Sequence, residues 1–156
     1  MRTYLLLLSF TFTIVSKSQS VNQKFEKVDQ YIFKIGALKN FNLATIADTI
    51  TSSFDSKEMK SRAIFSWIAG NIALNPKTTR NNDPKNSEPE TTIALRNASP
   101  LGMAKLFQEM ASLVGIRCLI VDGFTKSKTE NINNKEDETN ASWNVVQLGP
   151  SPGEWY

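Results

Sequence analysis

Apolar residues recur at helical spacing in the second half of the chain, and this pattern predicts its best-defined element. The i, i+3, i+4, i+7 spacing is kept by six residues: Met103, Leu106, Phe107, Met110, Leu113 and Val114. Ser99 is expected to cap the amino end of this helix and Pro100 suits its first position. Gly115 suits the left-handed conformation that ends many helices. The sequence therefore predicts an amphipathic helix over residues 100–114.

Further helical patterns lie upstream. The strongest has an apolar stripe of Ile64, Trp67, Ile68 and Ile72. Asp55 is expected to cap its amino end, with Glu58 three residues on as the partner in a capping box. Two weaker patterns come first in the chain: a short helix over residues 42–51, and helical spacing of Val28, Ile32 and Phe33.

Strand patterns follow the central helix. Residues 116–124 and 141–148 are rich in β-branched and apolar side chains, and residues 154–156 begin a third strand after a Gly/Pro turn. Two polar runs, 76–92 and 125–140, are expected to be surface loops that contribute nothing to the core. The order of elements predicts an α+β fold, with helices packed on a small antiparallel sheet.

The first twenty residues, MRTYLLLLSFTFTIVSKSQS, have the layout of a signal peptide. Arg2 is an early cation, an apolar stretch runs from Tyr4 to Val15, and small and polar residues close the segment. The stretch is too short to span a bilayer as a helix. A buried N-terminal strand is the less favoured alternative. We therefore expect cleavage near Ser18–Ser20 and a secreted or periplasmic protein, with no membrane span after the signal is removed.

The charge balance argues against a nucleic-acid partner. The formal net charge is +3, and removal of Arg2 and Lys17 with the signal peptide lowers it to +1. No single element carries a stripe of Lys and Arg. Cys118 is the one cysteine of the chain, so it cannot form an internal disulfide, and its apolar surroundings favour a buried core residue.

Four blocks of sequence, in order, resemble the transglutaminase-like proteins, and especially those of the kyphoscoliosis-peptidase type. The blocks are KSRAIFSWIAGNIALN, GMAKLFQEMASLVGIRCLIVDGF, NASWNVV and GEWY, and the resemblance covers residues 26–156. It implies a papain-like core and, in the family, a Cys-His-Asp triad that hydrolyses or transfers acyl groups. The organisation expected from it is residues 1–20 as signal peptide, 21–54 as a helical lead-in, and 55–156 as a truncated transglutaminase-like domain.

The triad positions that the resemblance implies carry other residues in this chain. Pro100 stands where the family has its cysteine and Ala141 where it has its histidine, while the aspartate position lies just beyond Tyr156. The resemblance therefore implies no catalytic residue here. A groove without chemistry is expected instead, formed by five residues: Ser99, Gly102, Met103, Trp143 and Asn144.

Ser99 and Trp143 each have a structural role that competes with a functional one. A Ser99 nucleophile assisted by Lys105 is less favoured than a Ser99 helix cap. Trp143 is favoured as a core residue of the sheet over a groove residue. The chain has no histidine, and the acidic run at residues 136–138 lacks the ligand spacing of a calcium loop, so neither a metal nor another cofactor is expected.

Two functions remain in view. The preferred one is an exported, non-catalytic binding or scaffold module, with a peptide, a protein or a cell-envelope ligand as its partner. The alternative is a fragment of a transglutaminase or cysteine-peptidase-like hydrolase, whose activity needs residues outside this chain.

Overall fold

The computed structural model describes residues 20–75, 87–123, 141–150 and 154–156. The helices are α1 (Ser20–Ile35), α2 (Leu43–Thr51), α3 (Lys57–Asn71), α4 (Pro89–Leu95) and α5 (Pro100–Leu113). The strands are β1 (Ala73–Leu74), β2 (Asn97–Ala98), β3 (Arg117–Gly123) and β4 (Ala141–Gln147). Most of the expected signal peptide, the loop at 125–140 and its acidic run lie outside the described residues, as does most of the loop at 76–92.

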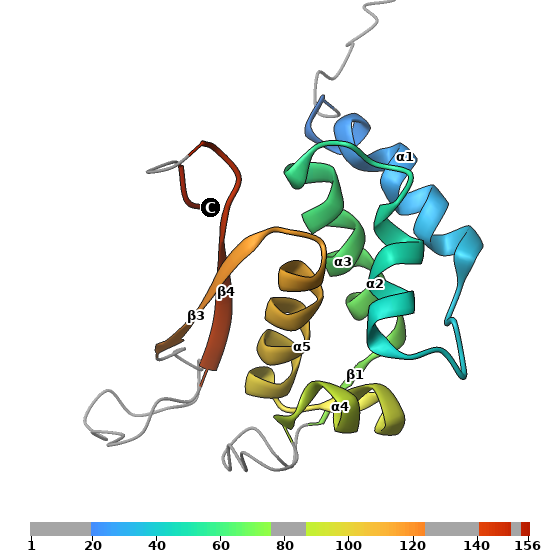
Figure 1. Cartoon of the computed structure of the whole chain (residues 1–156), viewed down its shortest axis with the longest axis vertical. Helices are drawn as coiled ribbons and strands as arrows, with labels where there is room; N and C mark the ends of the chain where they lie inside the picture. The colour runs from blue at the N-terminus through green and yellow to red at the C-terminus, as the bar shows by residue number, and fades with distance from the viewer. Residues whose placement is uncertain (1–19, 76–86, 124–140, 151–153) are drawn as a thin grey trace, which may run out of the picture.

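Helix α5 is the centre of the molecule. Strands β3 and β4 pack on one side of it and the other helices on the other side, as Figure 1 shows. The two strands are antiparallel, with Cys118 opposite Val146 and Val121 opposite Trp143. Trp155 forms an isolated antiparallel bridge with Gln147, and the Tyr156 backbone N–H donates to the Val146 carbonyl at 2.9 Å. The predicted α+β class, with helices packed on a small antiparallel sheet, is confirmed.

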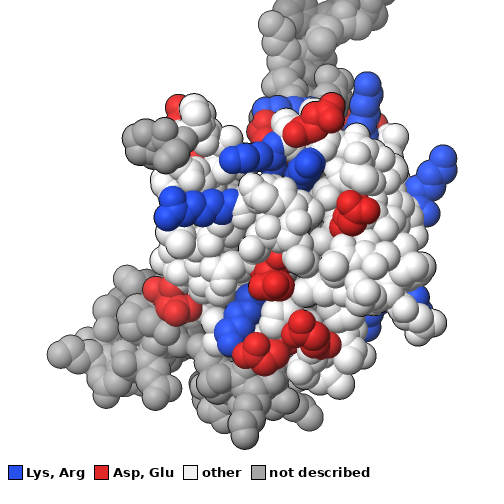
Figure 2. Space-filling view, in the orientation of Figure 1, with Lys and Arg blue, Asp and Glu red and all other residues white. Residues whose placement is uncertain are grey.

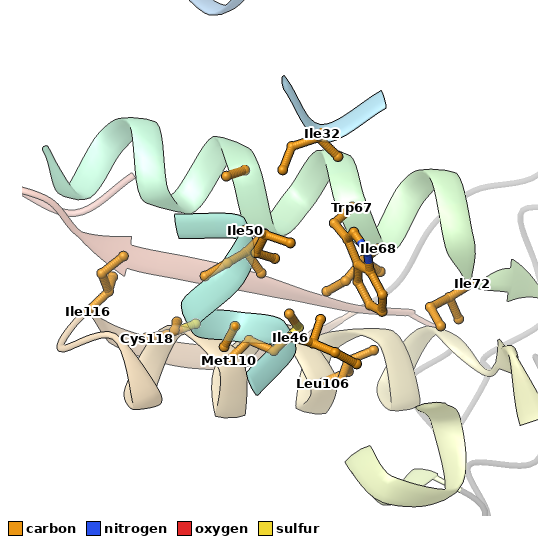
Figure 3. Packing of buried hydrophobic residues seen from close by; sticks show 14 of the residues in the cluster. Ile32, Ile46, Ile50, Trp67, Ile68, Ile72, Leu106, Met110, Ile116 and Cys118 are labelled. Atoms are coloured by element: carbon orange, nitrogen blue, oxygen red, sulfur yellow. The ribbon is translucent and has the colours of Figure 1, made fainter. Parts of the chain in front are cut away.

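The core lies between α5 and the helices α2 and α3. Figure 3 shows Ile46 and Ile50 of α2 with Met110 of α5, all of which are fully buried. Trp67 of α3 is also fully buried, and its indole N–H donates to the Gly36 carbonyl at 3.0 Å. Burial of such side chains is the main source of stability for a domain of this size. The apolar stripe predicted for α3 is confirmed by the burial of all four of its residues.

The caps of α5 are those that the sequence predicts. The Ser99 hydroxyl accepts a hydrogen bond from the Gly102 backbone N–H at 3.1 Å, and Pro100 occupies the first helical position. Gly115 has φ +75°, a conformation that glycine adopts without a Cβ clash. Within the stripe Leu113 is an exception: it is 47% exposed.

Two predictions of local structure are wrong. Ser56, and not Asp55, caps α3, because the Ser56 hydroxyl is the group that reaches the Met59 N–H, at 3.2 Å. Residues 87–92 are not surface loop, since α4 begins at Pro89, and Ser87 and Thr92 are buried. The helical spacing of Val28, Ile32 and Phe33 is confirmed by α1, in which Val28 and Ile32 are buried and Phe33 is 90% exposed.

One feature of the fold has no counterpart in the sequence pattern. Strands β1 and β2 form a parallel pair of two residues each, with Ala73 opposite Asn97 and Leu74 opposite Ala98. Their backbone bonds tie the end of α3 to the start of α5. In the described part of the chain, no helix is both long and apolar enough to cross a membrane.

Candidate functional site

The start of α5 and the start of β4 lie at the same end of the molecule. A tight turn after α5 sends β3 back toward the amino end of the helix, and β4 pairs antiparallel to β3 (Figure 1). Pro100 and Ala141 open these two elements. The fold thus brings to one end the two positions at which the family resemblance implies a nucleophile and a base.

An apolar groove of about 600 Å³ opens between α3, α5 and β4. Its lining consists of Phe65, Ile68, Ala69, Leu74, Pro100, Met103, Ala104, Phe107, Ser142, Trp143, Asn144 and Val146. No titratable side chain is among them. The size and the apolar lining are those of a site that binds a ligand. The lining offers hydroxyl and amide hydrogen bonds, but no group that takes up or releases a proton near neutral pH.

Asn144 fixes β4 to α5 beneath the groove. Its side-chain amide donates to the Ala104 carbonyl at 2.9 Å and to the Cys118 sulfur at 3.4 Å. Burial raises the pKa of the Cys118 thiol, and the hydrogen bond from Asn144 opposes part of that rise. A neutral thiol is a poor nucleophile, so Cys118 acts as a core residue, as the sequence predicts.

Trp143 is not the core residue that the sequence favours. Its side chain is 44% exposed and it borders the groove. The indole lies over Gly123, where a Cβ would stand 2.6 Å from Trp143 Cη2. The glycine therefore leaves the room in which the Trp143 ring rests on β3. Period-2 alternation explains the error: Trp143 and Val121 face each other on the side of the sheet away from α5.

Two of the residues predicted to form the groove lie at the buried start of α5 and do not line the groove. Ser99 is buried and its hydroxyl is 3.1 Å from that of Ser87. Gly102 is buried too, and a Cβ there would stand 3.0 Å from the Ala98 Cβ. Their contacts shape the start of the helix. Of the five residues predicted, Met103, Trp143 and Asn144 line the groove, whereas Ser99 and Gly102 do not.

The weaker Ser-Lys alternative finds no support in the geometry. Lys105 Nζ donates to the Glu88 carboxylate at 2.8 Å, and the Ser99 hydroxyl is engaged by the Gly102 N–H. Among the described residues, no three His, Cys, Asp or Glu side chains come together to hold a metal ion. That the protein works without a metal or cofactor stays a prediction.

Sequence reasoning missed the α3 wall of the groove. Phe65 is 54% exposed and its ring lies 5.3 Å from the Arg62 guanidinium carbon, which is also 5.3 Å from the Phe25 ring. Phe65 falls outside the buried stripe of α3, on the side where Arg62 and other polar residues lie. A large apolar residue on the wet side of an amphipathic helix was the available signal.

Comparisons with known proteins agree with the sequence blocks. A family model described as the transglutaminase-like superfamily matches residues 44–156. Kyphoscoliosis peptidase from Homo sapiens is 27% identical over 142 residues, which cover 90% of this chain and 21% of that protein. The protein of the same name from Mus musculus is 24% identical over 133 residues, covering 85% of this chain and 19% of that protein.

The chain therefore spans about a fifth of the length of the curated relatives it matches. A crystal structure of a TGase is also similar, with a TM-score of 0.47 and 15% identity over 90% of this chain and 33% of that one. The family match begins inside α2, whereas the sequence places the domain start at residue 55. The division into 21–54 and 55–156 stays a prediction.

Proposed function

The chain belongs to the transglutaminase-like superfamily, and from this premise we propose that it is a non-catalytic binding module. It holds an apolar segment of a peptide or protein in the groove between α3, α5 and β4. The export signal suggested by the first twenty residues gives a secreted or periplasmic protein, for which a cell-envelope component is a further ligand of the same chemistry. Binding in the groove needs no cofactor.

The observation that carries this proposal is the composition of the groove lining. Twelve residues line the groove, and none has a side chain that titrates. Acyl hydrolysis or transfer by a triad needs an ionisable nucleophile and a proton carrier within hydrogen-bond reach of each other. Pro100 has neither an ionisable side chain nor a backbone N–H. The groove is equipped to hold a ligand and not to transform it.

The lining also indicates the class of ligand. Phe65 and Leu74 line the groove, and each side chain is 54% exposed. Such an apolar patch, with Ser142 and Asn144 as its polar groups, suits uncharged side chains on an extended segment. A ligand that carried a charge into this groove would lose hydration without gaining a partner of opposite charge.

A hydrolase fragment is the rival function, and one observation favours it. The relatives named peptidase are several times longer than this chain, so groups that act on a substrate could come from outside it. In that case the groove would be a substrate subsite. The two functions differ in turnover: the binding module never converts its ligand.

The test uses residues 21–156 and an array of uncharged peptides with apolar side chains. Ala69 is exposed on α3 and lines the groove, so Ala69→Trp fills the groove without entering the core. The matched control is Ala44→Trp, an exposed alanine on α2 outside the groove. We expect Ala69→Trp to weaken binding by about tenfold or more, and Ala44→Trp to leave it unchanged.

The same peptides, incubated with the protein and a primary amine, report turnover by mass spectrometry. Intact peptides support the binding module. Cleavage or amine incorporation that Ala69→Trp abolishes would overturn it in favour of the hydrolase. Equal binding by the two tryptophan variants would remove the groove from the function altogether.

A further inference from the structure

A second cavity lies on another side of α5. It has a volume of about 470 Å³ and opens between the start of α2, α4 and the carboxyl half of α5. Its lining is Phe41, Asn42, Leu43, Ala44, Glu90, Ile93, Ala94, Glu109 and Leu113. None of these residues lines the first groove. The family resemblance assigns this cavity no role.

The cavity exposes apolar surface that the fold leaves uncovered. Phe41 is 51% exposed and Leu113 is 47% exposed, although Leu113 belongs to the apolar stripe of α5. Exposed apolar area of this kind is unfavourable relative to a covered surface, because water orders around it. Leu43 and Ile93 are partly buried and form the floor where the cavity meets the core. A partner that covered this patch would gain the burial that the chain itself lacks.

The two charged residues that line the cavity are both acidic. Glu90 in the first turn of α4 and Glu109 of α5 are exposed carboxylates of its lining, which contains no Lys or Arg. Within the described residues, neither carboxylate has an ion pair; the ion pairs present join Lys24 to Glu58, Arg62 to Asp29 and Lys105 to Glu88. Figure 2 shows carboxylates gathered over α4 and α5, with a basic side chain lying among them.

Lys105 is the cation of α5 that could neutralise this rim, and it is taken up elsewhere. Its ammonium group lies 2.8 Å from the Glu88 carboxylate. Lys105 lies one helical turn from Glu109, but its ammonium group pairs with Glu88, so Glu90 and Glu109 have no direct ion pair among the described residues. An apolar centre with a charged rim is the usual anatomy of a protein docking site.

We propose that this acidic-rimmed cavity docks a partner segment in which an apolar side chain is flanked by lysine or arginine. The apolar side chain enters between Phe41 and Leu113, and the cations pair with Glu90 and Glu109. Charge complementarity sets the partner: an acidic segment would be repelled by both carboxylates. The first groove, with its uncharged lining, selects a different ligand. The two sites are independent, so either proposal can fail alone.

The test uses residues 21–156 and two fluorescent synthetic peptides with one pattern of leucines, one carrying lysines and the other glutamates. Binding is titrated by anisotropy at low and high salt. We expect the lysine peptide to bind, more weakly at high salt, and the glutamate peptide to bind at least about tenfold more weakly. Ala44→Trp, which fills the cavity, should abolish binding of the lysine peptide. Ala69→Trp, which fills the first groove, should leave it unchanged.

Reversing the charges of Glu90 and Glu109 is a sharper test of the proposal than filling the cavity. In the double variant Glu90→Lys, Glu109→Lys the preference should invert, with the glutamate peptide now the tighter by about tenfold. Because a lysine in the first turn of α4 opposes the helix dipole, the double variant Glu90→Gln, Glu109→Gln is a second test, and it should bind both peptides alike. Thermal melts confirm that each variant is folded.

Three results would overturn the proposal. One is a lysine peptide that does not bind, or binds no more tightly than the glutamate peptide. Another is binding that persists in Ala44→Trp. The third is self-association of the chain without peptide, measured by light scattering and lost in Ala44→Trp, which would make a second copy the occupant.

Discussion

Pro100 and Ser99 both stabilise the start of α5. The resemblance places the nucleophile at Pro100, where a thiol would profit from the helix dipole. Proline at this position instead fixes φ at a helical value and removes an N–H that would have no helical partner. Ser99 supplies the cap. The local sequence is thus well suited to a stable helix terminus.

Replacement of Ser99 by alanine tests that role. The Ser99 hydroxyl caps α5 from a buried position, so Ser99→Ala should lower the free energy of unfolding by about 1.5 kcal/mol. Ser56→Ala removes the equivalent but exposed cap of α3 and should cost less, about 0.5–1 kcal/mol. Urea denaturation of both variants measures the difference. If Ser99→Ala abolished peptide cleavage or amine incorporation without lowering the free energy of unfolding, the capping role would be contradicted.

A partly exposed ion pair joins helix α1 to α3. Helix α1 precedes residues 44–156, which match the family model. Arg62 donates to both oxygens of Asp29, at 2.9 and 2.7 Å, and the Ser66 hydroxyl donates to the same carboxylate at 2.6 Å. The hydrogen bonds from Arg62 are the largest influence on the Asp29 pKa and lower it below its usual value of 3.8. Arg62 also contacts Phe65, so this link reaches the wall of the groove.

The pH dependence of stability tests this link between elements. Because the folded-state pKa of Asp29 is lowered, its stabilisation is full above pH 3.8 and is lost as the pH falls through the lowered value. Asp29→Asn should cost about 1 kcal/mol at neutral pH, a modest figure because the pair is about one-third exposed. The difference in the free energy of unfolding between wild type and Asp29→Asn should then narrow in acid.

Urea titrations between neutral pH and strong acid measure that difference. Glu58→Gln is the matched control, since its pair with Lys24 is more exposed, at 40% and 56%, and should contribute less at every pH. If the difference in the free energy of unfolding between wild type and Asp29→Asn widened in acid, the lowered pKa of Asp29 would be contradicted.

The described helices share one core across the boundary predicted at residues 54 and 55. Ile46 and Ile50 of α2 are fully buried, as are Ile64 and Trp67 of α3 and Leu106 of α5. From this shared core we predict that residues 21–54 do not melt separately from the rest. The whole molecule should therefore unfold in one cooperative step.

Ile46→Ala tests that cooperativity. The substitution removes fully buried methyl groups and should cost about 2–5 kcal/mol, lowering the unfolding midpoint of the whole chain. Tryptophan fluorescence and far-ultraviolet circular dichroism should shift together, because α2 is part of the core. Leu119→Ala, at a side chain 48% exposed, is the control and should cost far less. Separate transitions in Ile46→Ala would instead indicate that residues 21–54 unfold as an independent unit.

The sequence by itself determined the longer elements and the family. The stripe of α3, the caps of α5 at Ser99 and Gly115 and the two strands after it are encoded by periodicity and by residues that favour one backbone conformation. These signals act within a few residues, so they can be read without the fold. The four sequence blocks carried the resemblance to the superfamily, which the family match confirms.

Only the tertiary structure decided which surfaces are covered. The seven residues of α4 are too few for a clear period, and the pairing of β1 with β2 joins segments distant in sequence. Trp143 and Leu113 both follow apolar patterns, yet both remain exposed, because no element of the described chain packs over them. Periodicity tells which side chains share a face, whereas packing of the whole chain determines which faces are left open. The second cavity and the α3 wall of the first groove were therefore visible only in the folded molecule.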